Sequence, residues 1–190
     1  MARLKASMDV GTTVENAIRF YEEPPRKGLT VETEAGDLRL SPDDWAEAFE
    51  APDPGTPHNE ARDQVWEHLL AILWDAYDGD ESPDLLRTSL LRNRELVAAF
   101  NRAWPLLDAP DLVGDLWSVP AYLRRCAPGL GPDDVRRLQR TDPRAWTVPD
   151  LPFLDAARQR LGDPEVSRRR RRQRPSSPRS ASAWTGWSTS

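Results

Sequence analysis

The sequence contains a single cysteine, Cys126, among its 190 residues. One cysteine cannot form an internal disulfide, and it cannot supply a zinc cluster that needs several thiolates. Long apolar runs are also missing, because the longest, around Leu69 to Leu73, is far shorter than the roughly 20 residues that span a bilayer. The residues after Met1 are polar and charged rather than a hydrophobic signal core. We therefore expect a cytoplasmic protein in a reducing compartment, with no membrane contact.

The sequence also lacks the motifs with which nucleotide hydrolases hold their substrate. No Gly-x-x-x-x-Gly-Lys-[Ser/Thr] loop occurs, and such a loop is what wraps backbone amides and a lysine around phosphates. An acidic strand end such as Asp-Glu-Ala-Gln, which would hold magnesium in a helicase-type ATPase, is missing as well. We therefore predict no catalytic and no cofactor-binding residue in this chain.

Residues of the types that ligate metals or transfer protons have structural explanations. The two histidines, His58 and His68, are not joined by cysteines at metal-ligand spacing. His58 follows a proline at a helix entrance, where end-capping is the favoured interpretation, and His68 is expected at the boundary of a buried face. The pairs Asp43-Asp44 and Asp133-Asp134 follow prolines at helix starts, where carboxylates compensate the helix dipole. No metal ligand is predicted.

The formal charge of −5 is unevenly distributed along the chain. Residues 1–167 carry 19 basic and 31 acidic side chains, a net charge of −12, whereas the arginine-rich residues 168–179 carry +7. An acidic body binds nucleic acid poorly, because affinity increases with the number of cations that face the phosphates. We therefore expect a protein partner with a basic or mixed surface, and contact with nucleic acid only indirectly.

Hydrophobic periodicity predicts a mainly α fold, an array of short helices with one small β-hairpin and a disordered C-terminal tail. Residues 29–32 and 37–40 alternate apolar with polar side chains around a turn that ends in Gly36, which is typical of a hairpin. Proline, glycine or a capping residue bounds most of the predicted helices. These helices are 4–21 with an interruption at Gly11, one that begins at Ser41-Pro42, 59–77, one that begins at Ser82-Pro83, 93–104, 111–117, 120–126, 132–140 and 150–161.

Large aromatic rings between proline-bounded helices usually hold a core together and less often anchor a partner. From the set Trp104, Trp117, Tyr122 and Trp146, we expect Trp104 and Trp117 in the core. Arginines are interleaved with these rings, and solvated helix faces are their default interpretation. The candidates for contact with an acidic surface of a partner protein are Arg124, Arg125, Arg136, Arg137 and Arg144.

Three blocks of the sequence resemble the HelD-type superfamily 1 helicase-like ATPases of actinobacteria. They are Thr-Pro-His-Asn-Glu-Ala-Arg-Asp-Gln at 56–64, Asp-Leu-Val-Gly-Asp-Leu-Trp at 111–117 and Asp-Pro-Arg-Ala-Trp-Thr-Val at 142–148. Residues 151–162 extend the similarity, which covers nearly all of residues 3–173. The resemblance implies a UvrD/Rep-like motor that binds RNA polymerase, opens its clamp, and uses ATP and magnesium in releasing or recycling stalled enzyme.

On this resemblance, the chain corresponds to an internal piece of the motor. Residues 1–27 would be a remnant of the motor domain, and residues 28–166 a helical insertion that includes the clamp-opening arm. The family's nucleotide-binding lysine would lie upstream and its magnesium-binding acidic motif downstream, so no catalytic residue can be transferred to this chain. Residues 167–190 are expected to be a basic, disordered tail, and the sequence from about 174 onward fits a one-base frameshift.

Two functions remain open from the sequence. The leading hypothesis is a truncated HelD-like protein that lacks ATPase activity of its own and retains contact with RNA polymerase. The alternative is a free-standing helical adaptor or inhibitor that acts without ATP. An enzyme with an unfamiliar site is the weakest interpretation, because the titratable residues already have helix-end or surface explanations.

Overall fold

The computed structural model describes residues 2–33, 36–80 and 82–163 of the chain. Within these residues the protein is mainly helical and has one two-stranded antiparallel sheet, so the predicted fold class is confirmed. The predicted tail, residues 167–190, and the frameshift proposed for it lie outside the described residues.

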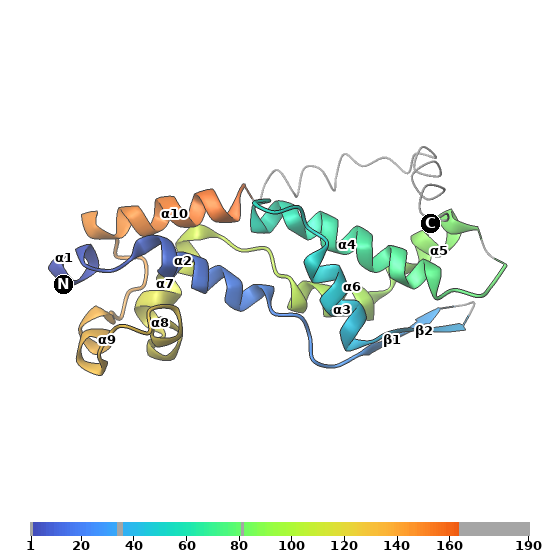
Figure 1. The fold of residues 1–190 in the computed structure, drawn as a ribbon, viewed down its shortest axis with the longest axis horizontal. Helices are drawn as coiled ribbons and strands as arrows, with labels where there is room; N and C mark the ends of the chain where they lie inside the picture. The colour runs from blue at the N-terminus through green and yellow to red at the C-terminus, as the bar shows by residue number, and fades with distance from the viewer. Residues whose placement is uncertain (1, 34–35, 81, 164–190) are drawn as a thin grey trace.

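The helices and strands form two hydrophobic cores, which fill opposite ends of an elongated molecule (Figure 1). The terminal lobe, residues 2–22 and 109–162, contains α1 (Ala2–Ala6), α2 (Val10–Arg19), η1 (Phe20–Glu22), α7 (Ala109–Ser118), α8 (Pro120–Cys126), α9 (Pro132–Leu138), η2 (Val148–Asp150) and α10 (Leu151–Leu161). The central lobe, residues 28–104, contains β1 (Leu29–Thr33), β2 (Gly36–Leu40), α3 (Pro42–Glu50), α4 (His58–Asp75), α5 (Pro83–Arg92) and α6 (Arg94–Ala103). The chain crosses between the lobes at 23–27 and at 105–108.

In the terminal lobe, α2 packs against α7, α8 and α10, so that the first described helices share a core with the last one. Ala17 and Ile18 of α2 are fully buried, and Trp117 of α7 meets Phe153 of α10 edge to face with 5.2 Å between ring centroids. The predicted core position of Trp117 is confirmed. The central lobe is therefore an insertion between α2 and α7. The division at residues 27 and 28, which refers to a parent motor, stays a prediction.

The N-terminal helical segment is interrupted at a different place from the one expected. Gly11 lies inside α2, whereas the break falls between α1 and α2, before Val10. The Asp9 carboxylate accepts hydrogen bonds from the backbone N and the hydroxyl of Thr12, at 3.0 and 2.7 Å. An aspartate that caps a new helix thus outweighs the weak helix propensity of one glycine.

The central lobe is built on α4, whose buried face includes Val65, Leu69 and Leu73. The predicted hairpin is confirmed, and its register pairs Val31 with Leu38, so that one face of the sheet adds to this core. The centre of the predicted turn, residues 34 and 35, lies outside the described residues. Next to the sheet, α3 begins at Ser41-Pro42 as predicted. Its capping box joins Asp44 N to the Ser41 hydroxyl at 3.1 Å and Ser41 N to the Asp44 carboxylate at 2.6 Å.

Candidate functional site

The junction of the two lobes is organised by His58, the first residue of α4. Its side chain is 1% exposed, with Nδ1 3.0 Å from a carboxylate oxygen of Glu22 and Nε2 2.9 Å from the carbonyl oxygen of Pro105. The imidazole stacks on Trp104 with 4.9 Å between centroids, and the indole of Trp104 donates to the His58 carbonyl at 3.0 Å. Both ring nitrogens therefore lie within hydrogen-bond distance of oxygen atoms outside α4.

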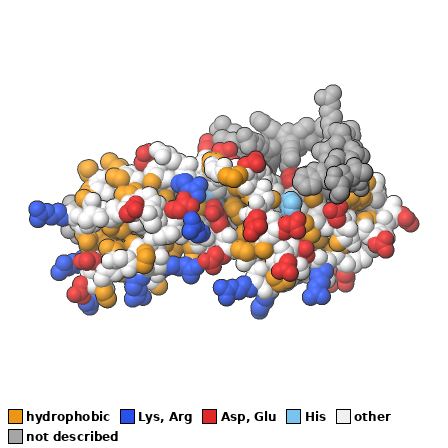
Figure 2. Space-filling view, viewed as in Figure 1, with side chains coloured by type: hydrophobic (Ala, Val, Ile, Leu, Met, Phe, Trp, Pro, Cys, Tyr) orange, Lys and Arg blue, Asp and Glu red, His pale blue; other side chains and the backbone are white. Residues whose placement is uncertain are grey.

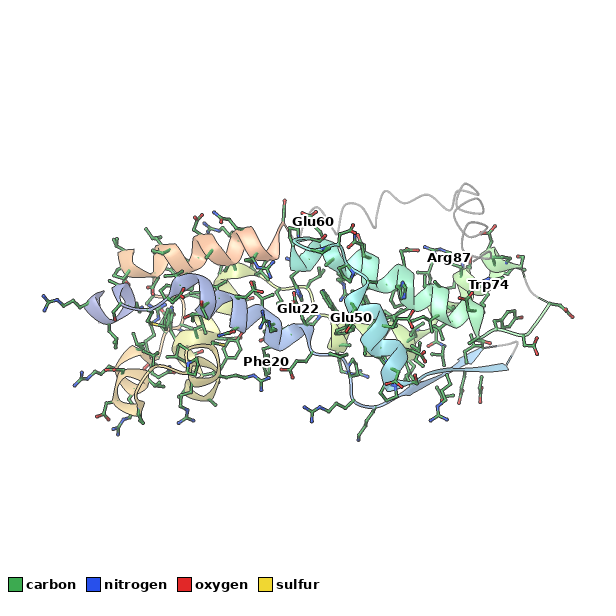
Figure 3. The ribbon with its side chains drawn as sticks, viewed as in Figure 1. Phe20, Glu22, Glu50, Glu60, Trp74 and Arg87 are labelled. Atoms are coloured by element: carbon green, nitrogen blue, oxygen red, sulfur yellow. The ribbon has the colours of Figure 1, made fainter. Side chains whose placement is uncertain are left out.

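Asn59 continues the junction one residue later. Its amide donates to the Leu107 carbonyl at 2.8 Å and accepts from Leu107 N at 2.9 Å. The same amide group lies 3.5 Å from the carbonyl oxygen of Gly162, just after α10. The first two residues of α4 thus contact the second crossing and the end of α10. They also contact Glu22, which is the last residue before the first crossing. Figure 3 shows Glu22 where η1 leads toward the central lobe.

The end-capping role predicted for His58 is wrong. The residue that precedes α4 is Pro57, which makes no side-chain cap, and the imidazole reaches away from its own helix to Glu22 and Pro105. His68 is half-buried and lies 2.9 Å from Glu47, so its predicted boundary position is confirmed. Sequence reasoning missed the junction because its partners lie 36 and 47 residues away from His58. A histidine and an asparagine side by side at a helix start gave only a weak signal.

A second buried polar cluster lies in the terminal lobe, around Asp150. The Asp150 side chain is fully buried and accepts hydrogen bonds from Lys5, from Arg140 at 3.0 Å, and from the hydroxyl and backbone N of Thr147 at 2.8 Å each. Lys5 Nζ also lies 4.3 Å from the ring centre of Trp117, a cation–π contact. Burial alone would raise the pKa of Asp150, but these hydrogen bonds outweigh it and lower the pKa to about 2. The cluster ties α1 to η2.

The arginines singled out from the sequence all lie in the terminal lobe, on α8, on α9 and in the loop after α9. Four of them are close to carboxylates: Arg125 to Glu23, Arg136 to Asp133, Arg137 to Asp134, and Arg144 to Asp111. Arg124 is exposed and has no carboxylate within ion-pair distance in the described part of the chain. Exposed ion pairs of this kind contribute little to stability. Their role as partner contacts stays a prediction.

Acidic charge is concentrated in one lobe. Residues 28–104 carry 6 basic and 17 acidic side chains, a net charge of −11. Residues 1–27 and 105–163 together carry 13 of each and are neutral. Figure 2 shows acidic side chains spread over the central lobe, whereas lysine and arginine gather at the other end and along the lower edge. The folded molecule therefore presents an acidic half and a neutral half.

Two kinds of feature are absent from the described residues. Among residues 2–33, 36–80 and 82–163, no three His, Cys, Asp or Glu side chains are grouped so as to hold a metal ion. No helix within these ranges has both the length and the apolar character needed to cross a bilayer.

The chain matches no protein-family model and no curated protein.

Proposed function

We propose that this chain is a protein-binding module whose central lobe contacts a positively charged surface of a larger partner. The observation that carries the proposal is the separation of charge between the lobes. Residues 28–104 carry a net charge of −11, whereas residues 1–27 and 105–163 together carry a net charge of zero. Opposite charges on two surfaces accelerate encounter and select the orientation in which they meet. A lobe at one end of an elongated molecule can enter a recess of a partner while the other lobe stays outside.

The resemblance to HelD-type proteins suggests RNA polymerase as that partner, in the cytoplasm. On this proposal the chain is a truncated relative that retains polymerase contact and has no ATPase activity of its own. ATP and magnesium belong to the parent family and are not assigned to residues of this chain.

A free-standing adaptor or inhibitor is the second candidate, and one observation favours it. The terminal lobe brings α1 and α2 together with α10 in one core, so most apolar side chains of the first and last described helices pack within this lobe. Exposed apolar side chains remain on this lobe at Val119, Val148 and Leu151, which are 42%, 78% and 55% exposed. Such side chains suit a protein interface that does not involve charge.

Capture of purified RNA polymerase by the immobilised chain tests the proposal. We expect retention at low salt that decreases as the salt concentration rises, because screening weakens contacts between surface charges. The variant Glu50→Gln/Asp78→Asn removes two exposed acids of the central lobe and should weaken retention. The matched control, Asp108→Asn/Asp155→Asn, removes two exposed acids elsewhere and should bind like the wild type.

The outcomes distinguish the two candidates. Failure to retain polymerase at any salt concentration would remove the first candidate and leave the second. Equal weakening in both variants would contradict the role of the central lobe. ATP turnover above background by the purified chain would contradict the absence of ATPase activity.

A further inference from the structure

A cavity of about 530 Å³ opens at the junction of the two lobes, beside the first crossing. The terminal lobe contributes Phe20 and Tyr21, and the central lobe contributes Trp45 of α3 and Ala99 of α6. Phe20 is 40% exposed, although most large apolar side chains of the described chain are buried. Figure 3 shows Phe20 at the end of the terminal lobe that faces the central lobe. The walls are therefore largely aromatic and aliphatic, as in sites for small organic molecules.

Two cations line the same cavity. They are Lys27, in the first crossing, and Arg102, in the last turn of α6. Neither lies within ion-pair distance of a carboxylate in the described parts of the chain. The one acidic residue of the lining, Glu23, is paired with Arg125, whose guanidinium also lies over the Phe20 ring. The cavity therefore carries uncompensated positive charge, although it borders the acidic lobe.

Trp45 contributes a buried aromatic side chain to the lining of the cavity. Its side chain is 1% exposed, and its indole Nε1–H has no acceptor among the described residues. Burial raises the pKa of Tyr21, another aromatic residue of the lining.

We propose that this cavity binds a small organic acid, one that joins an aromatic ring to a carboxylate. The ring would pack among Phe20, Tyr21 and Ala99, and the carboxylate would pair with Lys27 and Arg102. The volume lies within the range of about 300–1,000 Å³ that is usual for sites of small ligands. The proposal does not depend on the partner suggested for the central lobe.

Binding at this place would also couple the lobes. The lining comes from both of them and from the crossing that joins them. A ligand seated there would contact both lobes at once and favour the relative position in which the cavity is formed. Since it binds the folded state only, it would also raise the melting temperature, and the increase would grow with the logarithm of the ligand concentration above Kd.

A matched pair of ligands tests the charge requirement by isothermal titration calorimetry on the full chain. N-acetyltryptophan carries a ring and a carboxylate, whereas N-acetyltryptophanamide has the same ring and no charge. We expect the acid to bind at one site with a Kd at or below about 1 mM. The amide should bind at least tenfold more weakly. Absence of saturable binding by the acid, or equal affinity for the two ligands, would overturn the proposal.

Variants locate the site. Lys27→Gln/Arg102→Gln should abolish the preference for the acid, while Arg92→Gln/Arg124→Gln removes two exposed cations elsewhere and should retain it. Ala99→Phe fills the cavity and should weaken both ligands at least tenfold. Circular dichroism and the melting temperature without ligand show whether each variant folds. An equal loss of affinity for the acid in Lys27→Gln/Arg102→Gln and in Arg92→Gln/Arg124→Gln would identify general charge attraction and refute the site.

A third ligand separates a free acid from a protein segment. The blocked peptide acetyl-Ser-Asp-Trp-Ser-amide offers the same ring and an internal carboxylate. We expect it to bind more weakly than N-acetyltryptophan, because its flanking backbone must also be accommodated. Binding of the peptide at least tenfold tighter than the free acid would overturn the assignment to a small molecule.

Discussion

The buried cluster around Asp150 permits a quantitative prediction about stability. Asp150→Ala leaves the buried ammonium group of Lys5 without its carboxylate and removes one partner of Arg140. Breaking a buried ion pair on one side costs about 3–5 kcal/mol, because the remaining charge stays desolvated. We expect that loss in the free energy of unfolding. It is a large part of the roughly 5–15 kcal/mol that stabilises a typical domain.

The reason for this loss is tested by removing Lys5 as well. Lys5→Met alone should cost only about 1–2 kcal/mol, since Asp150 keeps the donors of Arg140 and Thr147. In the double variant no unpaired ammonium group remains, so it should be more stable than Asp150→Ala by about 1–3 kcal/mol. Urea denaturation followed by circular dichroism measures all four proteins. Losses that simply add, as for independent sites, would refute the role of the unpaired Lys5.

The same cluster predicts a dependence on pH. The pKa of Asp150 is lowered from 3.8 to about 2, so its carboxylate stabilises the fold above about pH 4. This contribution, about 2 kcal/mol, is lost as the pH falls from about 4 toward 2. Asp150→Ala should lack this part of the acid dependence, whereas the exposed control Asp155→Asn should keep it. Identical pH profiles for Asp150→Ala and the wild type would contradict the assignment.

Three further predictions concern the junction, a close backbone approach and the buried thiol. His58→Phe keeps a ring that can stack on Trp104 but loses two hydrogen bonds. Urea denaturation should therefore show a decrease of about 1–3 kcal/mol in the free energy of unfolding. Stability equal to that of the wild type would exclude a role of His58 in joining the lobes. Gly28→Ala places a Cβ 2.6 Å from the Leu40 carbonyl oxygen and should cost about 1–3 kcal/mol. Gly129→Ala, whose Cβ meets nothing within 4 Å, is its control and should change stability by less than about 1 kcal/mol. Burial raises the pKa of the Cys126 thiol to about 11. At pH 8 a thiol reagent should therefore label the native protein at least about 100-fold more slowly than the urea-unfolded protein. Equal labelling rates would refute the burial of this thiol.

Helix boundaries were predictable because their causes are local. The Ser41 side chain caps a backbone N–H of the first turn of α3, and Pro42 takes the first helical position, where a backbone N–H is not needed. Both effects involve only residues close in the chain, and α3 begins where they predict. The same holds for the hairpin, whose register follows from alternating side chains on both sides of Gly36. The prediction of a helix break at Gly11 was wrong for a local reason too, because Asp9 caps the start of α2 two residues earlier. Burial of Trp104 and Trp117 followed from their size and apolar surface.

Composition and short-range pattern were thus enough to predict a mainly helical fold, most of its helix and strand boundaries, and the burial of Trp104 and Trp117. They could not show that α1 and α2 share a core with α10, nor that Lys5 meets Asp150 across 145 residues of chain. They could not reveal the junction at His58 or the cavity beside the first crossing, whose walls come from both lobes. The physical reason is that hydrogen bonds within a turn or a helix end depend on neighbours in the chain. A buried ion pair or a cavity depends on which distant surfaces pack together, and many arrangements of the same helices satisfy the same local pattern.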